Sequence, residues 1–217
     1  GGGGSLGGDG GAAGAASGGT TGTPSGGPSS LTYDVNVRRS TFGIPHIQAD
    51  DFGSLGYGMG YAYGEDNVCT LMEDIVAIRG EHARYFGRNG SYTIFANGST
   101  ADSVDSDFFW RHVLTDEEIQ KFKDDASEDV NAVLEGYAAG FSRYVREIKS
   151  GEHAGRHPLC RNADWLFEIS VDDMYRRVIR LAVLASSSVF VEGVANAQPP
   201  VGGAGQTASS MTAGPAQ

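Results

Sequence analysis

Cysteine, long apolar runs and positive charge are all scarce in this sequence. Its two cysteines, Cys69 and Cys160, are far apart and outside any Cys-x-x-Cys pair, which excludes a four-cysteine zinc site. No apolar run approaches the roughly 18 residues that a membrane-spanning helix requires. Lys and Arg number 16 against 27 Asp and Glu. The net charge of −11 argues against nucleic acid as a partner, because phosphates require a basic surface.

Signatures of a self-contained catalytic site are also missing. No G-x-S-x-G motif accompanies the many serines. His46 lies between Pro45 and Ile47 in an expected strand, which favours a packing role. The other four histidines have no metal-ligand spacing. The pairs at 124–125 and 172–173 are interpreted as a solvated face and a helix cap rather than as general acids.

Glycine is abundant, with 33 residues, and many of them lie in the first 30 positions. Residues 1–30 carry one charge and no aromatic side chain, so they are expected to form a flexible linker. Residues 198–217 have the same character and are expected to form a flexible tail. The folded part is therefore predicted to span residues 31–197.

Apolar periodicity predicts two short strands followed by helices. The strands are expected at 33–37, where apolar residues alternate, and at 42–47. A helix should follow the next glycines and end near Gly87, residues 88–107 should form a loop, and a helix capped at Thr115 should run to Gly151. Ser170 should cap a last helix through Val194. Two strands make a poor sheet, so another chain is expected to complete it.

The stretch GSLGYGMGYAYGEDN at 53–67 leads into an expected helix although it is rich in glycine. Each glycine inside a helix costs about 1 kcal/mol relative to alanine, so the glycines need a structural reason. On a helix, Gly56, Gly60 and Gly64 fall at i, i+4 and i+8 and form one bare stripe. Such a stripe lets a second backbone come very close. A glycine loop is the alternative, and a membrane helix dimer is disfavoured because Glu65 and Asp66 follow at once.

Several of these segments together resemble the start of the α chain of the penicillin acylase family of N-terminal-nucleophile hydrolases. The resemblance covers about residues 33–200. Within the family, the sequence is most similar to the branch that contains acyl-homoserine-lactone acylases and the aculeacin A acylase. Its most specific segments are residues 42–49, 56–62, 65–67, 72–73 and 79–81.

The resemblance implies an α+β fold, in which this mostly helical chain is one subunit of a four-layer αββα sandwich. A larger β chain, cut from the same exported precursor, would complete the short strands. The first residue of the β chain would be the nucleophilic serine, with its own α-amino group as the base. No catalytic residue is therefore expected in this chain.

The family's acyl pocket takes part of its wall from the last helix of the α chain. The resemblance places that wall near Ala182, Ala185 and Ser186, whose small side chains would leave room for a long or varied acyl chain. The alternative is that these are ordinary packed helix positions. The same register places Glu192 where penicillin G acylase supplies a carboxylate to a structural calcium ion. A solvated charge is the simpler interpretation.

The residues alone leave the cysteines as buried thiols in a reducing compartment or as a disulfide in an exported protein. Because the resemblance implies export, it predicts the pair Cys69–Cys160 and a periplasmic or secreted location. The opening GGGGS would also suit a lipid-anchored protein.

The function implied is cleavage of the amide of N-acyl-homoserine lactones, which is quorum quenching. β-Lactams such as penicillins and cyclic lipopeptides are the other candidate substrates, and no cofactor is required. The alternative from a different class is a secreted, non-catalytic binding or structural module, because this chain holds no complete catalytic constellation.

Overall fold

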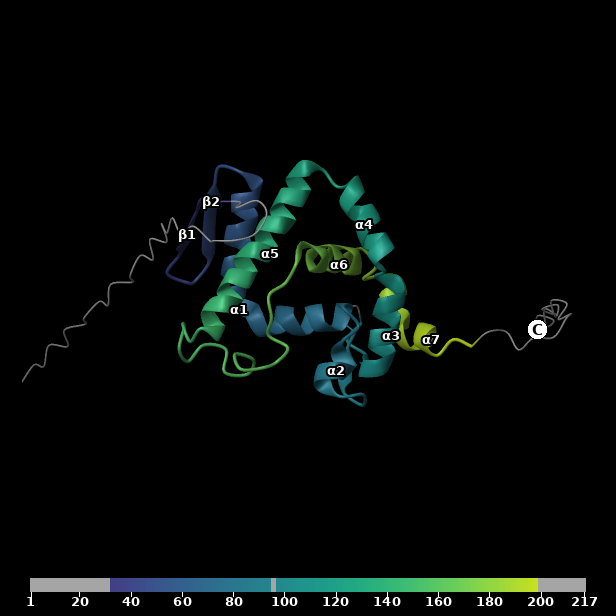
Figure 1. The fold of residues 1–217 in the computed structure, drawn as a ribbon. Helices are drawn as coiled ribbons and strands as arrows, with labels where there is room; N and C mark the ends of the chain where they lie inside the picture. The colour runs from purple at the N-terminus through teal and green to yellow at the C-terminus, as the bar shows by residue number, and fades with distance from the viewer. Residues whose placement is uncertain (1–31, 95–96, 199–217) are drawn as a thin grey trace, which may run out of the picture.

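The computed structural model describes residues 32–94 and 97–198. The predicted linker at 1–30, and the predicted tail beyond Gln198, lie outside the described residues. The elements in chain order are β1 (Val35–Arg39), β2 (Pro45–Ala49), α1 (Phe52–Ile78), α2 (His82–Phe86), β3 (Ser91–Thr93), β4 (Thr100–Asp102), α3 (Ser103–Val113), α4 (Asp116–Asp125), α5 (Glu128–Lys149), α6 (Val171–Ala182), the 3₁₀ turn η1 (Ser187–Phe190) and α7 (Val191–Ala195) (Figure 1).

The two expected strands are present as β1 and β2, shifted by two or three residues from the predicted bounds, and they pair as an antiparallel hairpin. Val37 lies opposite Ile47 in its register. The inner face of the hairpin packs on α1 at Gly58, where a Cβ would lie 2.6 Å from a methyl carbon of Val35 and 2.7 Å from one of Ile47. The alternation of apolar residues thus predicted the buried face correctly.

The glycine stretch is helical, and its stripe meets a second glycine stripe on α5. Cβ atoms added at Gly56 and Gly60 would each lie 2.1 Å from a carbonyl oxygen of α5. Cβ atoms added at Gly136 and Gly140 would each lie 2.0 Å from a carbonyl oxygen of α1. The two helices run parallel, backbone against backbone, and α1 lies between the hairpin and α5 (Figure 1). The prediction of a close helix contact is confirmed.

Helix α1 is bent at Asn67, whose φ of −140° and ψ of 29° are not helical. Just before the bend, Arg39 of the hairpin donates to the carbonyl of Ala62 at 3.2 Å, and Arg156 donates to the carbonyl of Glu65. Arg39 also pairs with the Glu65 side chain at 2.8 Å. The side chain of Glu65 and the backbone carbonyls of Ala62 and Glu65 therefore fasten the hairpin and the segment after α5 to α1.

Two predicted boundaries in the first half of the chain are wrong. Helix α1 ends at Ile78, not near Gly87, because Gly80 has a φ of +67° and the chain turns there before α2. Gly87 instead follows α2 and has a φ of +86°. The expected loop at 88–107 contains the hairpin β3–β4 and the start of α3, so the described residues have four strands rather than two.

Two predicted helices in the second half are each divided. The helix expected from Thr115 to Gly151 breaks at Ala126, and the hydroxyl of Ser127 then accepts from the backbone N–H of Val130 to start α5. Figure 1 shows α4 and α5 meeting there at a sharp angle. The last helix ends at Ala182 rather than Val194, and α7 begins only after the η1 turn.

The core gathers around the second half of α1, where α3, α5 and α6 converge. Its largest fully buried side chains include Trp110, Tyr144, Tyr175, Phe109 and Phe141. The predicted disulfide between Cys69 and Cys160 is present and ties α1 to the segment that follows α5.

Both two-stranded sheets end in edges that have no strand partner among the described residues. Across the same residues, no helix taken singly has the length and apolar composition needed to cross a membrane. The pair formed by α6 and Ser187–Ala195, bent by 87°, meets those two criteria only when counted together.

Candidate functional site

Helix α6 and the bend that follows it carry the residues predicted to line an acyl pocket. Ala182 is the last residue of α6, and Ala185 and Ser186 lie in the turn before η1. All three are exposed, and the helix axes on either side differ by 87°. The three residues therefore lie at an elbow, not on one face of a continuous helix as the sequence predicts.

The outward face of α6 is apolar. Val178 and Leu181 are 40% and 45% exposed, and Ala182 lies beside them at i+4 from Val178. Val178 and Leu181 are two of twelve large apolar side chains that are exposed among the described residues, and Phe190, 62% exposed, lies just beyond the elbow. This face together with the elbow forms an apolar wall that is open on one side.

The start of α6 is fixed by a buried ion pair with the end of α1. Asp173 is fully buried, forms a capping box with Ser170, and accepts from Arg79 at 2.6 and 2.5 Å. Burial would raise the pKa of Asp173, but the hydrogen bonds from Arg79 and Ser170 outweigh it and hold the pKa below its ordinary value. Arg79 also lies 4.5 Å from the ring centroid of Phe167. The expected cap at 172–173 is confirmed, with a buried role that the sequence did not show.

Glu192, the predicted calcium ligand, lies in the first turn of α7 and is exposed. In the part of the chain that the structure describes, it belongs to no group of side chains whose oxygen or nitrogen atoms are close enough to share an ion. Calcium requires six to eight oxygen ligands, so any site at Glu192 would need most of its ligands from another chain.

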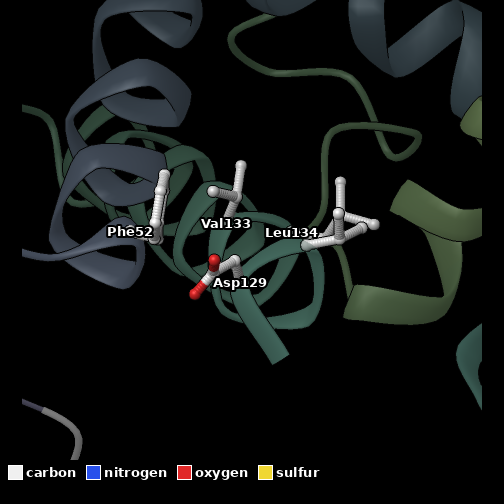
Figure 2. Close-up of a pocket in the computed structure, with 5 residues that line it drawn as sticks. Phe52, Asp129, Val133 and Leu134 are labelled. Carbon is white, nitrogen blue, oxygen red and sulfur yellow. The ribbon is translucent and has the colours of Figure 1, made fainter. Parts of the chain in front are cut away.

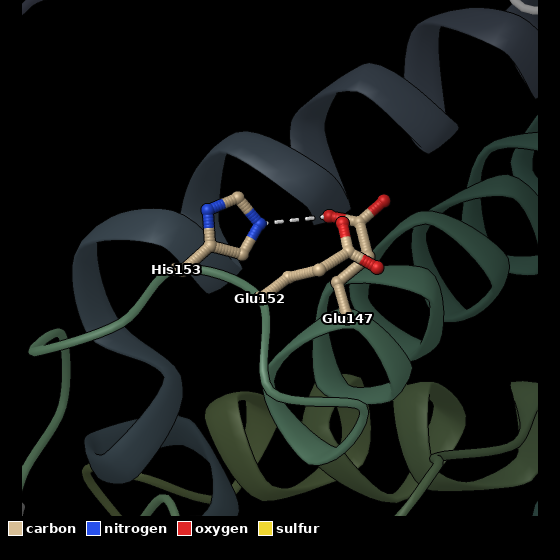
Figure 3. Close-up of side chains that lie close together, drawn as sticks. All are labelled: Glu147, Glu152 and His153. Atoms are coloured by element: carbon tan, nitrogen blue, oxygen red, sulfur yellow. Dashed lines mark hydrogen bonds and ion pairs between the residues drawn. The ribbon is translucent and has the colours of Figure 1, made fainter.

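A different group, Glu147, Glu152 and His153, does bring its ligand atoms within 4.8 Å of one another (Figure 3). The carboxylate of Glu147 is already occupied, because it accepts from Arg143 at 2.7 Å, from Tyr61 at 2.8 Å and from His153 at 2.9 Å. Burial would raise the pKa of Glu147, but these hydrogen bonds lower it. With a guanidinium this close, the group suits an ion-pair network at the end of α5 better than a cation site.

A buried Ser–His pair, which sequence reasoning missed, joins α2 to the start of α3. His82 Nδ1 lies 2.8 Å from Ser103 Oγ. Asp107 accepts from the backbone N–H of His82, not from its ring, so the three do not form a triad. Both side chains are 1% exposed or less, so the pair is closed to substrate and serves packing.

A small, open apolar cleft lies between the first turns of α1 and α5. Phe52, Asp129, Val130, Val133 and Leu134 line its roughly 170 Å³ (Figure 2). That volume is smaller than the ~300–1,000 Å³ of ordinary ligand pockets, and none of the predicted pocket residues lines it. The predicted pocket residues therefore lie away from this cleft, on the exposed side of α6 and the elbow.

Comparison with known proteins places the chain in a family. The family model for penicillin amidase matches residues 34–185. An acyl-homoserine lactone acylase, PvdQ, from Pseudomonas fluorescens is 34% identical over 171 residues, which are 79% of this chain and 21% of that protein. Aculeacin-A acylase from Actinoplanes utahensis is 33% identical over 168 residues, 77% of this chain and 21% of that protein.

The chain therefore spans about a fifth of the length of the curated relatives it matches. Among solved structures, a thermostable penicillin G acylase from Alcaligenes faecalis superimposes with a TM-score of 0.55 at 22% identity, covering 75% of this chain and 76% of that one. The expected fold is confirmed as penicillin acylase-like, mostly helical with short strands. The matched residues run from β1 to the elbow after α6, and the chain belongs to the penicillin amidase family of amidohydrolases.

Proposed function

We propose that this chain is the α subunit of an exported two-chain amidohydrolase that cleaves N-acyl-homoserine lactones. The observation that carries the proposal is the pairing of two facts: relatives named acyl-homoserine lactone acylases match it at 31–36% identity, and the chain spans only 20–21% of their length. The rest of such a protein has the size of a larger partner chain.

The catalytic groups belong to that partner in this proposal. The hydroxyl of its first residue, a serine, attacks the amide carbonyl while its α-amino group takes the proton and returns it to the leaving amine. Water then hydrolyses the acyl ester, releasing a fatty acid. Backbone and side-chain donors of the same partner stabilise the oxyanion. Our chain contributes binding surface.

Its contribution is the apolar wall of α6 and the elbow. Val178, Leu181 and Ala182 expose aliphatic carbon that a free surface would not favour, and an acyl chain together with the partner chain would cover it. Ala185 and Ser186, at the elbow, are small enough to leave space for a long chain. Export agrees with the Cys69–Cys160 disulfide, since such bonds persist in oxidising compartments.

The first experiment is expression of the complete gene, followed by intact mass and N-terminal sequencing. We expect a larger chain beginning with serine to co-purify and to release homoserine lactone from long-chain substrates. A chain that purifies alone and folded, with no hydrolysis, would instead make it a binding module. Activity should survive calcium chelation, because the chemistry requires no cofactor. Loss of activity on chelation would instead support a calcium site at Glu192.

Substitution at the elbow tests the pocket assignment. Ala182→Phe should shift preference toward shorter acyl chains, because the added ring would take up length in the pocket. One methylene in an apolar pocket is worth about 1–3 kcal/mol, so a chain shorter by several carbons should gain at least about tenfold in relative kcat/KM. Gly193→Ala, on α7 where an added Cβ meets nothing within 4 Å, is the control. An unchanged chain-length profile would remove Ala182 from the pocket.

Cyclic lipopeptides are the second candidate substrate class. The observation that favours them is the 33% identity to aculeacin-A acylase, nearly equal to the identity to PvdQ. Penicillins are the third, supported by the family model alone. Parallel assays on an acyl-homoserine lactone, a lipopeptide and a penicillin, ranked by kcat/KM, decide between them.

A further inference from the structure

The segment that joins α5 to α6 holds two histidines in an unfavourable backbone conformation. His153 and His157 both have a φ of 52°, and no other residue that the structure describes, glycine aside, has a positive φ. The left-handed region disfavours residues that carry a Cβ, so side-chain contacts must hold both residues in place. The contacts of the two rings therefore decide whether this segment stays closed.

Both histidines lie against the ring of Tyr144 on α5. Their ring centroids are 4.9 and 5.7 Å from that of Tyr144, and His157 Nε2 lies 2.9 Å from its hydroxyl oxygen. Tyr144 is fully buried, and its hydroxyl has no other hydrogen-bond partner among the described residues. We therefore assign His157 the neutral tautomer with its proton on Nδ1, because only then can Nε2 accept from the buried hydroxyl.

The surroundings of His157 oppose a second proton. Burial lowers the pKa of His157, as do the charges of Arg156 and Arg161, and these effects outweigh a contact with the backbone of Glu65 that raises it. A proton on Nε2 would also leave the hydroxyl of Tyr144 without an acceptor. Because the folded pKa lies below the ordinary value of about 6.5, the closed segment is fully stabilised above that pH and loses stability as pH falls below it.

Carboxylates face this cluster from both helices, but their charges are already paired. Those that act on Tyr144 are Glu65 and Asp66 of α1 and Glu147 of α5. Arg39 pairs with the first two at 2.8 and 3.0 Å, and Arg143 pairs with the third at 2.7 Å. These carboxylates therefore offer little to balance a charge on His157.

His153 has the opposite surroundings and provides an internal comparison. Its Nε2 lies 2.9 Å from a carboxylate oxygen of Glu147, and the exposed Glu152 is close by (Figure 3). A proton on this ring would place a positive charge beside a carboxylate, so the contact persists in acid. A charged His153 also lowers the pKa of His157. The two histidines thus share a backbone conformation and a tyrosine but respond to acid in opposite ways.

The ends of the segment are fixed independently of His157. At its start, the backbone N–H of Glu152 donates to the carbonyl of Glu147 at 2.9 Å. At its end, Cys160 is bonded to Cys69 of α1. Residues 153–159 can therefore loosen while the chain on either side stays in place.

We propose that His157 is an acid-sensitive latch on this segment. When His157 takes up a proton, its contact with Tyr144 is lost. Residues 153–159, which carry the 90% exposed Leu159, then come away from α1 and α5 while the disulfide keeps Cys160 tethered. The latch is a property of this chain alone and does not rest on the proposed function.

Hydrogen exchange, measured by mass spectrometry on the protein made from the complete gene, tests the latch. The amides of Arg156 and Cys160 each donate at 3.1 Å within the segment and report its opening. Between pH 7.5 and 5.5 their protection, corrected for intrinsic exchange, should fall several-fold and by up to about tenfold, because the open form binds one more proton below pH 6.5. Amides of α5 in the same sample should not change. Unchanged protection of residues 153–160 would overturn the latch.

His157→Asn and His153→Asn are a matched pair, because asparagine tolerates the left-handed backbone and does not titrate. His157→Asn should remove the pH dependence, and His153→Asn should retain most of it. The latch is wrong if His157→Asn loses protection in acid as the wild type does. Tyr144→Phe decides the case in which His157→Asn is already open at pH 7.5. Without the hydroxyl, the loss of protection in acid should be smaller than in the wild type, and an equal loss would exclude the contact with Tyr144 as the latch.

Discussion

Replacing Gly60 with alanine should destabilise the protein, against the usual effect of this substitution. In an open helix, Gly→Ala gains up to about 1 kcal/mol. At Gly60 the new Cβ would lie 2.1 Å from the carbonyl oxygen of Tyr137, where ordinary contact requires about 3.4 Å or more. The obstacle is backbone on both sides, so neither helix can relieve it by turning a side chain.

The cost follows from the distance. The helices must separate locally by more than about 1 Å, and that opens the contacts of Gly56, Gly136 and Gly140 as well. Overpacking in a well-packed region costs about 1–3 kcal/mol, and a backbone obstacle belongs at the upper end. After the gain in helix propensity is subtracted, we expect a net loss of about 2 kcal/mol.

Thermal unfolding of the purified protein measures this loss. A loss of 2 kcal/mol corresponds to a decrease in Tm of roughly 4–8 °C for a domain of this size. Gly193→Ala is the matched control, because its Cβ meets nothing within 4 Å, and it should leave the Tm unchanged or raise it. Equal Tm values for the Gly60→Ala and Gly193→Ala variants would refute the backbone contact between α1 and α5.

Two further predictions concern covalent and ionic links. Under denaturing, non-reducing conditions the protein should show no free thiol, and two titratable thiols would contradict the disulfide. Cys160→Ser should lower the free energy of unfolding by up to about 4 kcal/mol, since the bond joins residues 91 positions apart. Arg79→Met should cost about 3 kcal/mol near pH 7, because it removes the bidentate cation of the buried Asp173 and leaves only the longer contact with Arg176, at 3.4 Å. The folded pKa of Asp173 is lowered, so the stabilisation is present above the unfolded pKa of about 3.9 and is lost as pH falls through the folded value. The difference in unfolding free energy between wild type and Arg79→Met, measured by urea unfolding, should therefore narrow below about pH 4. A difference that does not depend on pH would exclude the Arg79–Asp173 ion pair as its cause.

Local signals in the sequence predicted local structure well. The i, i+4, i+8 spacing of Gly56, Gly60 and Gly64 indicated a close helix contact, and Ser170 with Asp173 marked a helix start. These signals did not identify the residues of this chain that the glycine stripe and Asp173 would contact. The stripe meets glycines of α5, and Asp173 pairs with Arg79, a residue 94 positions away.

The missed boundaries have physical causes that periodicity does not register. Apolar spacing continues across Ala126, although Ser127 caps a new helix there. Past Ala182 the chain holds no glycine or proline before Gly193, so a continuous helix was expected. In the structure, the hydroxyl of Ser186 donates to the carbonyl of Val183 at 3.1 Å, and the hydroxyl of Ser188 donates to the carbonyl of Leu184 at 2.7 Å. These side-chain hydrogen bonds compete with those of a continuing helix, and the helix ends there.

The candidate site was predictable only in part. The resemblance located Ala182, Ala185 and Ser186 at one place in the chain, and the structure shows that place as an exposed elbow. The ion pairs of Asp74 with Arg177 and Arg180, which join α1 to α6, gave no sequence signal because their residues lie about 100 positions apart.

The contact between α1 and α5 also has a consequence for the order of events during folding. It joins residues about 80 positions apart, such as Gly60 and Tyr137, so the intervening chain must lose loop entropy before the contact forms. The Cys69–Cys160 bond encloses nearly the same loop. A chain whose disulfide is already formed therefore begins folding with most of that loop closed. We expect it to refold faster than the reduced chain, whose distant segments must first meet by diffusion.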